Sequence, residues 1–274
     1  MMPSDKPIEK PALINPRVIP PVNWVGLSTL IGKEVGRFIN VYTQTILAPV
    51  VTTLLYYAVF ALAFGGLARM IGDISYMTFL APGLIMMTMV QNAFANTSSS
   101  IVISKVQGNI VDVLMPPLSA GEIFTGYLAG GILRGMMVGF VVMVAVWAVV
   151  GLEIHALWAV VAYALLGTAM LSALGLAAGI WSEKFDHIAA VTNFVVMPLT
   201  FLSGTFYSAE QLPGIWNKLV HYNPFFYMID GFRYGFTGHA DGNLMAGFIA
   251  LVLINLALGV LSLCMIRKGY KIKS

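Results

Sequence analysis

The stretch NTSSSIVISKVQGNIVDVLMPPLSAG, residues 96–121, separates two long apolar runs and decides how the chain is organised. Lys105 and Asp112 make it too polar for a membrane-spanning helix, whereas its valine, leucine and isoleucine side chains need an apolar partner. The Pro116-Pro117 pair ends any helix there, because proline lacks a backbone N–H and restricts the residue before it. The stretch therefore predicts an amphipathic helix of about two turns, over 104–112, at a membrane face where another protein can move this one.

The composition is that of an integral membrane protein. The chain has 274 residues, of which 58% are hydrophobic and 10% charged, and its mean hydropathy is +0.84. A soluble domain has about 25% charged residues. The single cysteine, Cys264, excludes an internal disulfide. The net charge of +3 is small and lies mostly on one predicted side of the membrane, which indicates topology and argues against nucleic-acid binding.

Two different segments are predicted before the first apolar run. Residues 1–23 contain six prolines among basic residues, which is typical of a disordered tail. Residues 24–40 have apolar and basic side chains on opposite helical faces, which predicts an interfacial amphipathic helix in contact with membrane lipid, its Lys and Arg outward. A helix packed on a partner protein is the alternative. The residues that define the two faces are Trp24, Leu27, Ile31, Lys33, Arg37 and Phe38.

Six apolar runs have the roughly 20 residues that a helix needs to cross a bilayer. We therefore predict an all-α membrane protein with six transmembrane helices. With the N-terminus in the cytoplasm, eleven Lys and Arg residues fall on the inner side and three on the outer side, so both termini are expected in the cytoplasm. The predicted spans are 46–64, 76–95, 123–150, 156–181, 188–207 and 244–266.

The last outer connection, residues 208–243, is predicted to form a re-entrant helical hairpin between spans five and six. Ser208 begins a capping-box pattern that predicts a helix over 211–220. The Asn223-Pro224 pair then predicts the start of a second helix. That second piece, residues 225–236, is apolar but only about 18 Å long by helix rise, so it cannot span the bilayer. Non-helical backbone at such a hairpin is tolerated where it is buried in protein.

Four stretches of the sequence resemble the type-2 ABC transporter permeases, and among these most resemble the bacterial YadH-type permeases. The resemblance covers nearly all of the chain beyond the proline-rich tail. It implies one transmembrane domain, residues 24–274, in the bacterial inner membrane. The stretches are KEVGRFINVYTQTILAPVV (33–51), SYMTFLAPGLIMMTMVQNAFANTSSS (75–100), GYLAGGILRGMMVG (126–139) and FLSGTFYSAEQLPGIWNKLVHYNPFFYMIDGFRYGFTG (201–238).

The resemblance also implies partners. Such a permease works as a homodimer of exporter subunits, and each copy contacts a separate ABC ATPase that holds ATP and magnesium. Residues 100–121 would be the cytoplasmic coupling loop, and helix 24–40 a smaller second contact. The family often has a carboxylate where this chain has Val111, so Asp112 is the remaining acidic candidate. The residues expected to contact the ATPase are Gln107, Gly108, Asn109, Ile110, Asp112 and Leu114.

The residues themselves argue against an energy source or an active site within this chain. Gly32-Lys33 is followed by Glu34, so no G-x-x-x-x-G-K-[ST] phosphate loop occurs. The apolar runs contain no Asp, Glu or His, whereas a gradient-driven carrier generally needs ionisable groups at membrane depth. An enzyme acting on lipid-linked substrates would need clustered carboxylates or histidines, which the sequence lacks. We predict no catalytic, cofactor-binding or metal-binding residue.

Polar residues within the apolar runs are candidates for a substrate pathway. Arg134 lies near the middle of the third run, where it either faces an internal cavity or snorkels to the interface. Thr88, Asn92 and Asn96 recur every four residues on one helical face. They either line a substrate path or form hydrogen bonds across helices.

Two further features leave alternatives open. Gly131, Gly135 and Gly139 form a small-residue ridge that favours close helix packing over a hinge. Asp230 and Arg233, three residues apart, either neutralise each other or gate the outer mouth. The aromatic residues expected near that mouth suit a glycan, a lipid or a drug equally, so the sequence does not choose a substrate.

Overall fold

The computed structural model describes residues 20–63, 70–72 and 74–272, so all but the last four residues of the predicted proline-rich tail lie outside it. Most of the described residues are helical, and a short antiparallel pair is formed by β1 (Met70–Ile71) and β2 (Ile74–Ser75). Five helical segments are long and apolar enough to cross a membrane. The predicted all-α membrane class is confirmed.

The five long segments correspond to five of the six predicted spans. The predicted fifth span, 188–207, has a shorter counterpart of 17 residues, Phe185–Phe201. It consists of α7 (Phe185–Val191), the π-helix η3 (Thr192–Val196) and α8 (Met197–Phe201). The long segments are the π-helix η1 (Thr43–Leu47) continuing into α2 (Ala48–Ala63), α3 (Tyr76–Val106), α5 (Ala120–Val150), α6 (Leu157–Trp181) and α11 (Leu244–Lys268).

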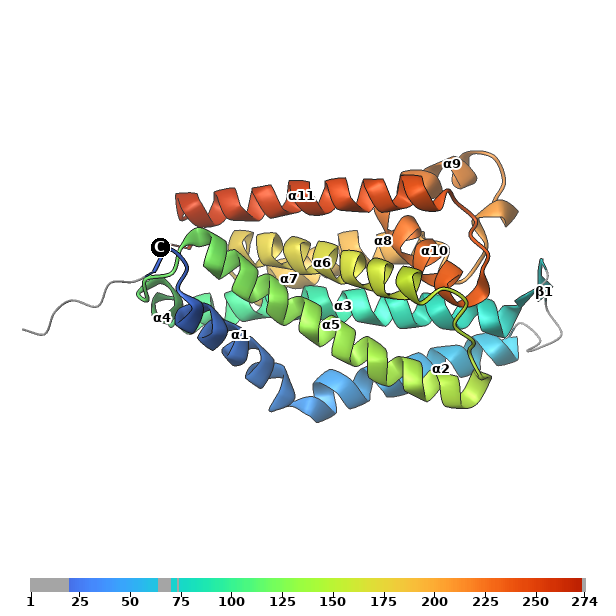
Figure 1. Cartoon of the computed structure of the whole chain (residues 1–274), viewed down its shortest axis with the longest axis horizontal. Helices are drawn as coiled ribbons and strands as arrows, with labels where there is room; N and C mark the ends of the chain where they lie inside the picture. Colours follow the sequence, from blue (N-terminus) through green and yellow to red (C-terminus); the bar gives the residue numbers. More distant parts are fainter. Residues whose placement is uncertain (1–19, 64–69, 73, 273–274) are drawn as a thin grey trace, which may run out of the picture.

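The helices form an elongated bundle with α3 and α6 at its centre (Figure 1). The side chains of α2 and α11 are mostly exposed and apolar, as in Leu62 and Leu256, which fits contact with lipid or with another membrane helix. The C-terminus and α4 (Val111–Leu114) lie at one end of the bundle, and α9 (Ile215–Tyr222) and α10 (Pro224–Thr237) at the other (Figure 1). We call these the α4 end and the α10 end.

The glycine ridge of α5 lies where neighbouring helices approach it closely, as the packing interpretation predicts. A Cβ added at Gly130 would lie 2.6 Å from the Cβ of Glu34. One added at Gly135 would lie 2.9 Å from the carbonyl oxygen of Met89. Both distances are too short for a real Cβ atom to fit there. Glycine at these positions therefore lets α5 pack directly against α1 (Trp24–Ile39) and α3. Gly131 and Gly139 make similar close approaches.

The polar stretch 96–121 is divided among the end of α3, a turn, the short helix α4 and the start of α5. Residues 96–100 lie inside α3, which continues to Val106, so the prediction that this helix ends at residue 95 is wrong. The predicted two-turn helix over 104–112 is also wrong, because Gly108 has φ +74° and breaks it. α4 is a single turn, and Ser119 then starts α5 with a capping box that includes Glu122.

The outer connection contains two helices, but the first starts later than predicted. Ser208 caps only a 3₁₀ turn, η4 (Ala209–Gln211), and α9 begins after Gly214, whose φ is +49°. The predicted start of the second helix is confirmed, because the Asn223 side chain accepts a hydrogen bond from the Phe225 N–H at 3.0 Å. α10 packs among α3, α6 and α11, which buries most of its side chains.

Candidate functional site

α1 presents a polar residue in its buried face. Leu27, Leu30, Glu34 and Phe38 are buried, and their spacing follows one side of the helix. Trp24 and Lys33 are exposed. Arg37 does not point outward as predicted: its guanidinium turns toward α3, because polar acceptors are available there.

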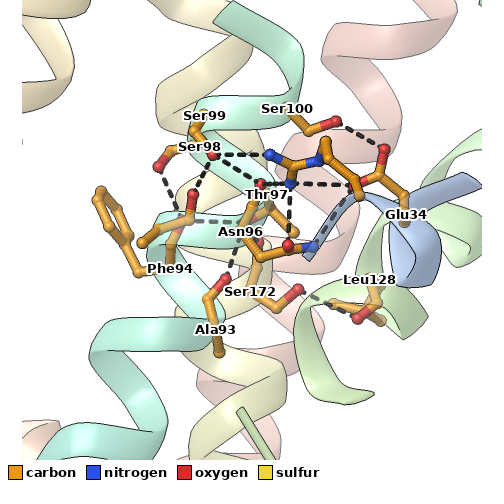
Figure 2. A network of polar contacts seen from close by, with 12 residues as sticks. Glu34, Ala93, Phe94, Asn96, Thr97, Ser98, Ser99, Ser100, Leu128 and Ser172 are labelled. Carbon is orange, nitrogen blue, oxygen red and sulfur yellow. Dashed lines mark hydrogen bonds and ion pairs between the residues drawn. The ribbon is translucent and has the colours of Figure 1, made fainter. Parts of the chain in front are cut away.

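Glu34 and Arg37 form a largely buried polar network with residues 96–100 in the C-terminal half of α3 (Figure 2). The Glu34 carboxylate accepts a hydrogen bond from Ser100 Oγ at 2.6 Å and one from Asn96 Nδ2 at 3.4 Å. Arg37 Nη2 lies 3.3 Å from Glu34 Oε2 and donates to the Asn96 carbonyl oxygen at 2.6 Å and to Asn96 Oδ1 at 2.9 Å. Arg37 Nη1 donates to Ser99 Oγ at 3.2 Å. α1 is therefore tied to α3 by charged hydrogen bonds.

The stripe Thr88–Asn92–Asn96 continues this network toward α5 and α2. Arg134 Nη2 donates to Asn92 Oδ1 at 3.1 Å, so Arg134 faces α3 at mid-helix and does not extend along α5 toward its end. Thr88 Oγ1 lies 2.8 Å from Thr53 Oγ1 of α2. The stripe thus bonds across helices, and Thr88 and Asn92 also line a groove of about 270 Å³ between α2 and α3.

Three buried polar atoms of this region have no hydrogen-bond partner. They are Arg37 Nε, Arg134 Nε and the hydroxyl of Tyr127, a residue that is fully buried in α5. Buried polar groups in proteins are normally paired. The two arginines are accompanied by one carboxylate, Glu34, so the region carries a net positive charge.

Asp230 and Arg233 are both buried in α10, but each bonds to a different part of the chain. Arg233 donates to the carbonyl oxygens of Gly204 at 2.6 Å and Phe79 at 3.2 Å, and its guanidinium lies 3.7 Å from the centre of the Phe79 ring. The Asp230 carboxylate accepts from the N–H groups of residues 241 and 242, at 2.9 Å each. The opposite charges attract each other without a direct ion pair between these two described residues.

The predicted coupling residues are presented at the α4 end. Gln107, Gly108, Asn109 and Asp112 are exposed, whereas Ile110 and Leu114 pack on a small apolar cluster that includes buried Val113. A groove of about 400 Å³ separates this segment from α1 and is lined in part by Lys33, Asn109 and Asp112.

Basic side chains secure the same end of the bundle. Lys105 Nζ donates to the carbonyl oxygens of Ile180 and Ser182 at the end of α6. Lys271 Nζ lies 2.8 Å from Glu183 Oε1, and this hydrogen bond lowers the pKa of the Glu183 carboxyl below its ordinary value. Within residues 20–63, 70–72 and 74–272, no three His, Cys, Asp or Glu side chains gather to hold a metal ion.

Comparison with known proteins identifies the family. A family model described as "ABC-2 type transporter" matches residues 26–237, which include all but the first two residues of α1, the network and the segment around α4. The chain belongs to the ABC-2 type transporter family. It is 40% identical over 252 residues to the inner membrane transport permease YadH of Escherichia coli K12, covering 92% of this chain and 98% of that protein.

More distant relatives of this ABC-2 family chain include nodulation proteins. It is 27% identical over 202 residues to nodulation protein J of Sinorhizobium fredii, covering 72% of this chain and 76% of that protein. It is 25% identical over 177 residues to nodulation protein J of Rhizobium leguminosarum bv. trifolii, covering 64% and 67%. The resemblance noted in the sequence is confirmed by the family match and by the similarity to YadH.

Some buried polar residues of this region are not marked by a sequence pattern. Glu34, Ser100, Thr53 and Tyr127 were not among the predicted site residues. The signal for Glu34 was its position three residues before Arg37 on a helix, a spacing that places two side chains on one face. Nothing comparable marked Tyr127, which is buried only by the tertiary fold.

Proposed function

We propose that this chain is the membrane-spanning permease subunit of an ATP-driven exporter. The observation that carries the proposal is the exposed segment 107–114, held at the end of the central helix α3 in a member of the ABC-2 transporter family. In this proposal the chain works as a homodimer. Separate ATPase subunits hold ATP and magnesium and dock on Gln107, Gly108, Asn109, Ile110, Asp112 and Leu114.

The distribution of charge supports a cytoplasmic α4 end. Lys105 and Lys271 contact the loop after α6, and Lys268 ends α11 nearby, so basic side chains gather there. Both termini are then cytoplasmic. The similarity to YadH, an inner membrane transport permease, supports the inner membrane as the location of this multi-pass protein. Residues 185–201 complete a sixth crossing, residues 208–243 form the outer re-entrant hairpin, and α1 lies at the inner interface with Trp24 in contact with lipid.

The network gives this proposal a mechanical route. ATP-driven closure of the partner ATPases presses on residues 107–114 and displaces the end of α3. Because Asn96, Ser99 and Ser100 bond to α1, the displacement moves α1 as well. The polar stripe of Thr88, Asn92, Asn96 and Arg134 would line the substrate path, and Asp230 and Arg233 would hold the outer gate.

A charge reversal in the coupling segment tests the proposal. The tagged chain is purified from its native membranes, and copurified protein is assayed for ATP hydrolysis and identified by mass spectrometry. We expect an ABC ATPase with the wild type and at least tenfold less with Asp112→Arg. The matched control is Asp186→Arg, because Asp186 is also exposed and follows Glu183 at the α4 end.

Two outcomes contradict the proposal at different levels. If no ATPase accompanies the wild-type chain, the ATP-driven exporter is wrong. If Asp112→Arg and Asp186→Arg retain equal ATPase activity, the exporter stands and the coupling role of segment 107–114 is wrong.

A further inference from the structure

Arg134 is a charge at membrane depth without a carboxylate partner. It lies fourteen residues after the start of α5, about 21 Å along the helix, and is half-buried. None of the ion pairs among the described residues includes it. A charge near the bilayer centre is costly and is normally paired or in contact with a polar cavity.

The nearest carboxylate in the network is already engaged elsewhere. The Glu34 carboxylate accepts hydrogen bonds from Ser100, Asn96 and Arg37, so it neutralises the charge of Arg37 and not that of Arg134. Arg37 donates a hydrogen bond to Asn96, and Arg134 donates one to Asn92. The two asparagines lie one helical turn apart on α3. Arg134 therefore keeps an unneutralised charge, a buried Nε without a partner, and a single neutral acceptor at Asn92.

Asn92 connects this charge to the groove between α2 and α3. The groove has a volume of about 270 Å³ and lies between two spanning segments. Asn92 lines the groove and also bonds to Arg134 on its other side. The lining of the groove is partly polar, because it includes Gln44, Thr52, Thr53, Thr88, Gln91 and Asn92 beside apolar residues such as Leu84 and Met87.

Apolar side chains also line the groove or adjoin it. Leu84 and Met87 line it, and Val51 and Leu55, each more than half exposed on α2, precede the lining residues Thr52 and Tyr56 in the chain. Polar and apolar side chains in one groove, with a positive charge behind Asn92, match a molecule that has an anionic group and an adjoining hydrocarbon part.

We propose that this groove, with Arg134 bonded to its lining residue Asn92, binds an oxyacid anion of the phosphate or carboxylate type. Arg134 does not line the groove itself, so its positive charge acts on the anion across Asn92, at a depth where charges are weakly screened. Asn92 and the groove threonines supply further hydrogen bonds to the oxygen atoms. The inference deepens the proposed function, because the bound anion is then part of the exported substrate.

Direct binding tests the inference without the ATPase. The purified chain in neutral detergent is incubated with ³²P-labelled hexadecyl phosphate, and unlabelled compounds compete. We expect competition by hexadecyl phosphate and by hexadecanoate, and at least tenfold weaker competition by hexadecanol and by hexadecyltrimethylammonium. Inorganic phosphate competing as well as hexadecyl phosphate supports the anion site and assigns it to a water-soluble anion instead of an amphiphile.

Substitutions distinguish the contribution of the Arg134 charge to anion binding from that of the groove side chains. Arg134→Gln is expected to weaken binding at least tenfold, about 1.4 kcal/mol, and Arg134→Lys to weaken it less. Gln91→Leu, which removes a groove amide without touching Arg134, is expected to weaken binding even if Arg134→Gln does not fold. The matched control is Lys268→Gln, because Lys268 is an exposed cation at the end of α11.

The inference is wrong if hexadecanol competes as well as hexadecyl phosphate, or if Arg134→Gln and Gln91→Leu bind as tightly as the wild type. These results are independent of the proposed function, which depends on copurified ATPase activity. If the chain binds the anion but has no ATPase partner, the proposed anion site stands and the proposed ATP-driven exporter is wrong.

Discussion

Removing the Glu34 carboxylate is expected to destabilise the bundle more than removing any exposed acid. Glu34 is fully buried, and its 2.6 Å bond from Ser100 is a hydrogen bond to a charged group, which contributes about 1.5–3 kcal/mol. The bond from Arg37 adds less, about 0.5–1 kcal/mol, because the Arg37 side chain is 26% exposed and keeps its bonds to Asn96. Glu34→Ala should therefore cost about 2–4 kcal/mol of unfolding free energy.

Thermal unfolding in detergent, followed by tryptophan fluorescence, measures this loss. For a chain of this size, 3 kcal/mol corresponds to a fall of about 6–12 °C in the midpoint. The matched control is Glu183→Ala, because Glu183 is 58% exposed and pairs with Lys271 at the surface. It should change the unfolding free energy by no more than about 0.5 kcal/mol.

Double-mutant cycles then divide the loss between the two partners of Glu34. The coupling of Glu34→Ala with Ser100→Ala should be about 1–2 kcal/mol, and its coupling with Arg37→Ala smaller, because the Arg37 contact is longer at 3.3 Å. The reasoning fails if Glu34→Ala and Glu183→Ala shift the midpoint equally. It also fails if the Arg37 coupling exceeds the Ser100 coupling.

Two other substitutions test the packing and the outer end. Gly130→Ala should cost about 1–3 kcal/mol because its Cβ would meet Glu34, whereas Gly32→Ala, with no atom within 4 Å, should be neutral or stabilising by up to about 1 kcal/mol. Equal midpoints for both would contradict the close packing of α5 on α1. Arg233→Met leaves the carbonyl oxygens of Phe79 and Gly204 without their donor and should cost about 2–4 kcal/mol, while exposed Lys218→Met should cost little. A neutral Arg233→Met in the same thermal assay would refute this anchoring role.

The sequence predicted the long helices well because hydrophobic length is a local property. The prediction that α3 ends at residue 95 was wrong because the burial of its last turns depends on residues far away in the chain. Asn96, Ser98 and Ser100 are polar, so the span was expected to end before them, but all three are buried within α3. Partners such as Glu34, which lies 66 residues away from Ser100 in the chain, decide this burial, and no local pattern contains them.

The orientation of α1 illustrates the same limit. Its apolar residues predicted an amphipathic helix, and a helix is present over residues 24–39. The basic side chains were expected to face outward, but Arg37 is directed inward because Asn96 and Ser99 offer acceptors there. Only Lys33 is exposed as predicted. A side chain with several donors follows its acceptors, which the sequence does not locate.

Glycine backbone angles explain the differences at both connections. The helix predicted over 104–112 is interrupted at Gly108, and the helix predicted from Ser208 starts only after Gly214; both glycines have positive φ. Glycine permits such angles without requiring them, so the pattern alone could not exclude a continuous helix. By contrast, Asn223-Pro224 predicted a helix start correctly, because the proline ring fixes its own backbone angle.

The Lys105 contact joins the ends of the two central helices. The last carbonyl groups of α6 have no donor within their own helix and carry its negative dipole end, so an ammonium group there is well placed. Because Lys105 belongs to α3 and donates to Ile180 and Ser182, the tips of α3 and α6 cannot part without exposing a cation and its acceptors. In the proposed mechanism, a load applied at α4 would consequently be shared by α3 and α6, and sliding of α3 along α6 would be resisted by these hydrogen bonds.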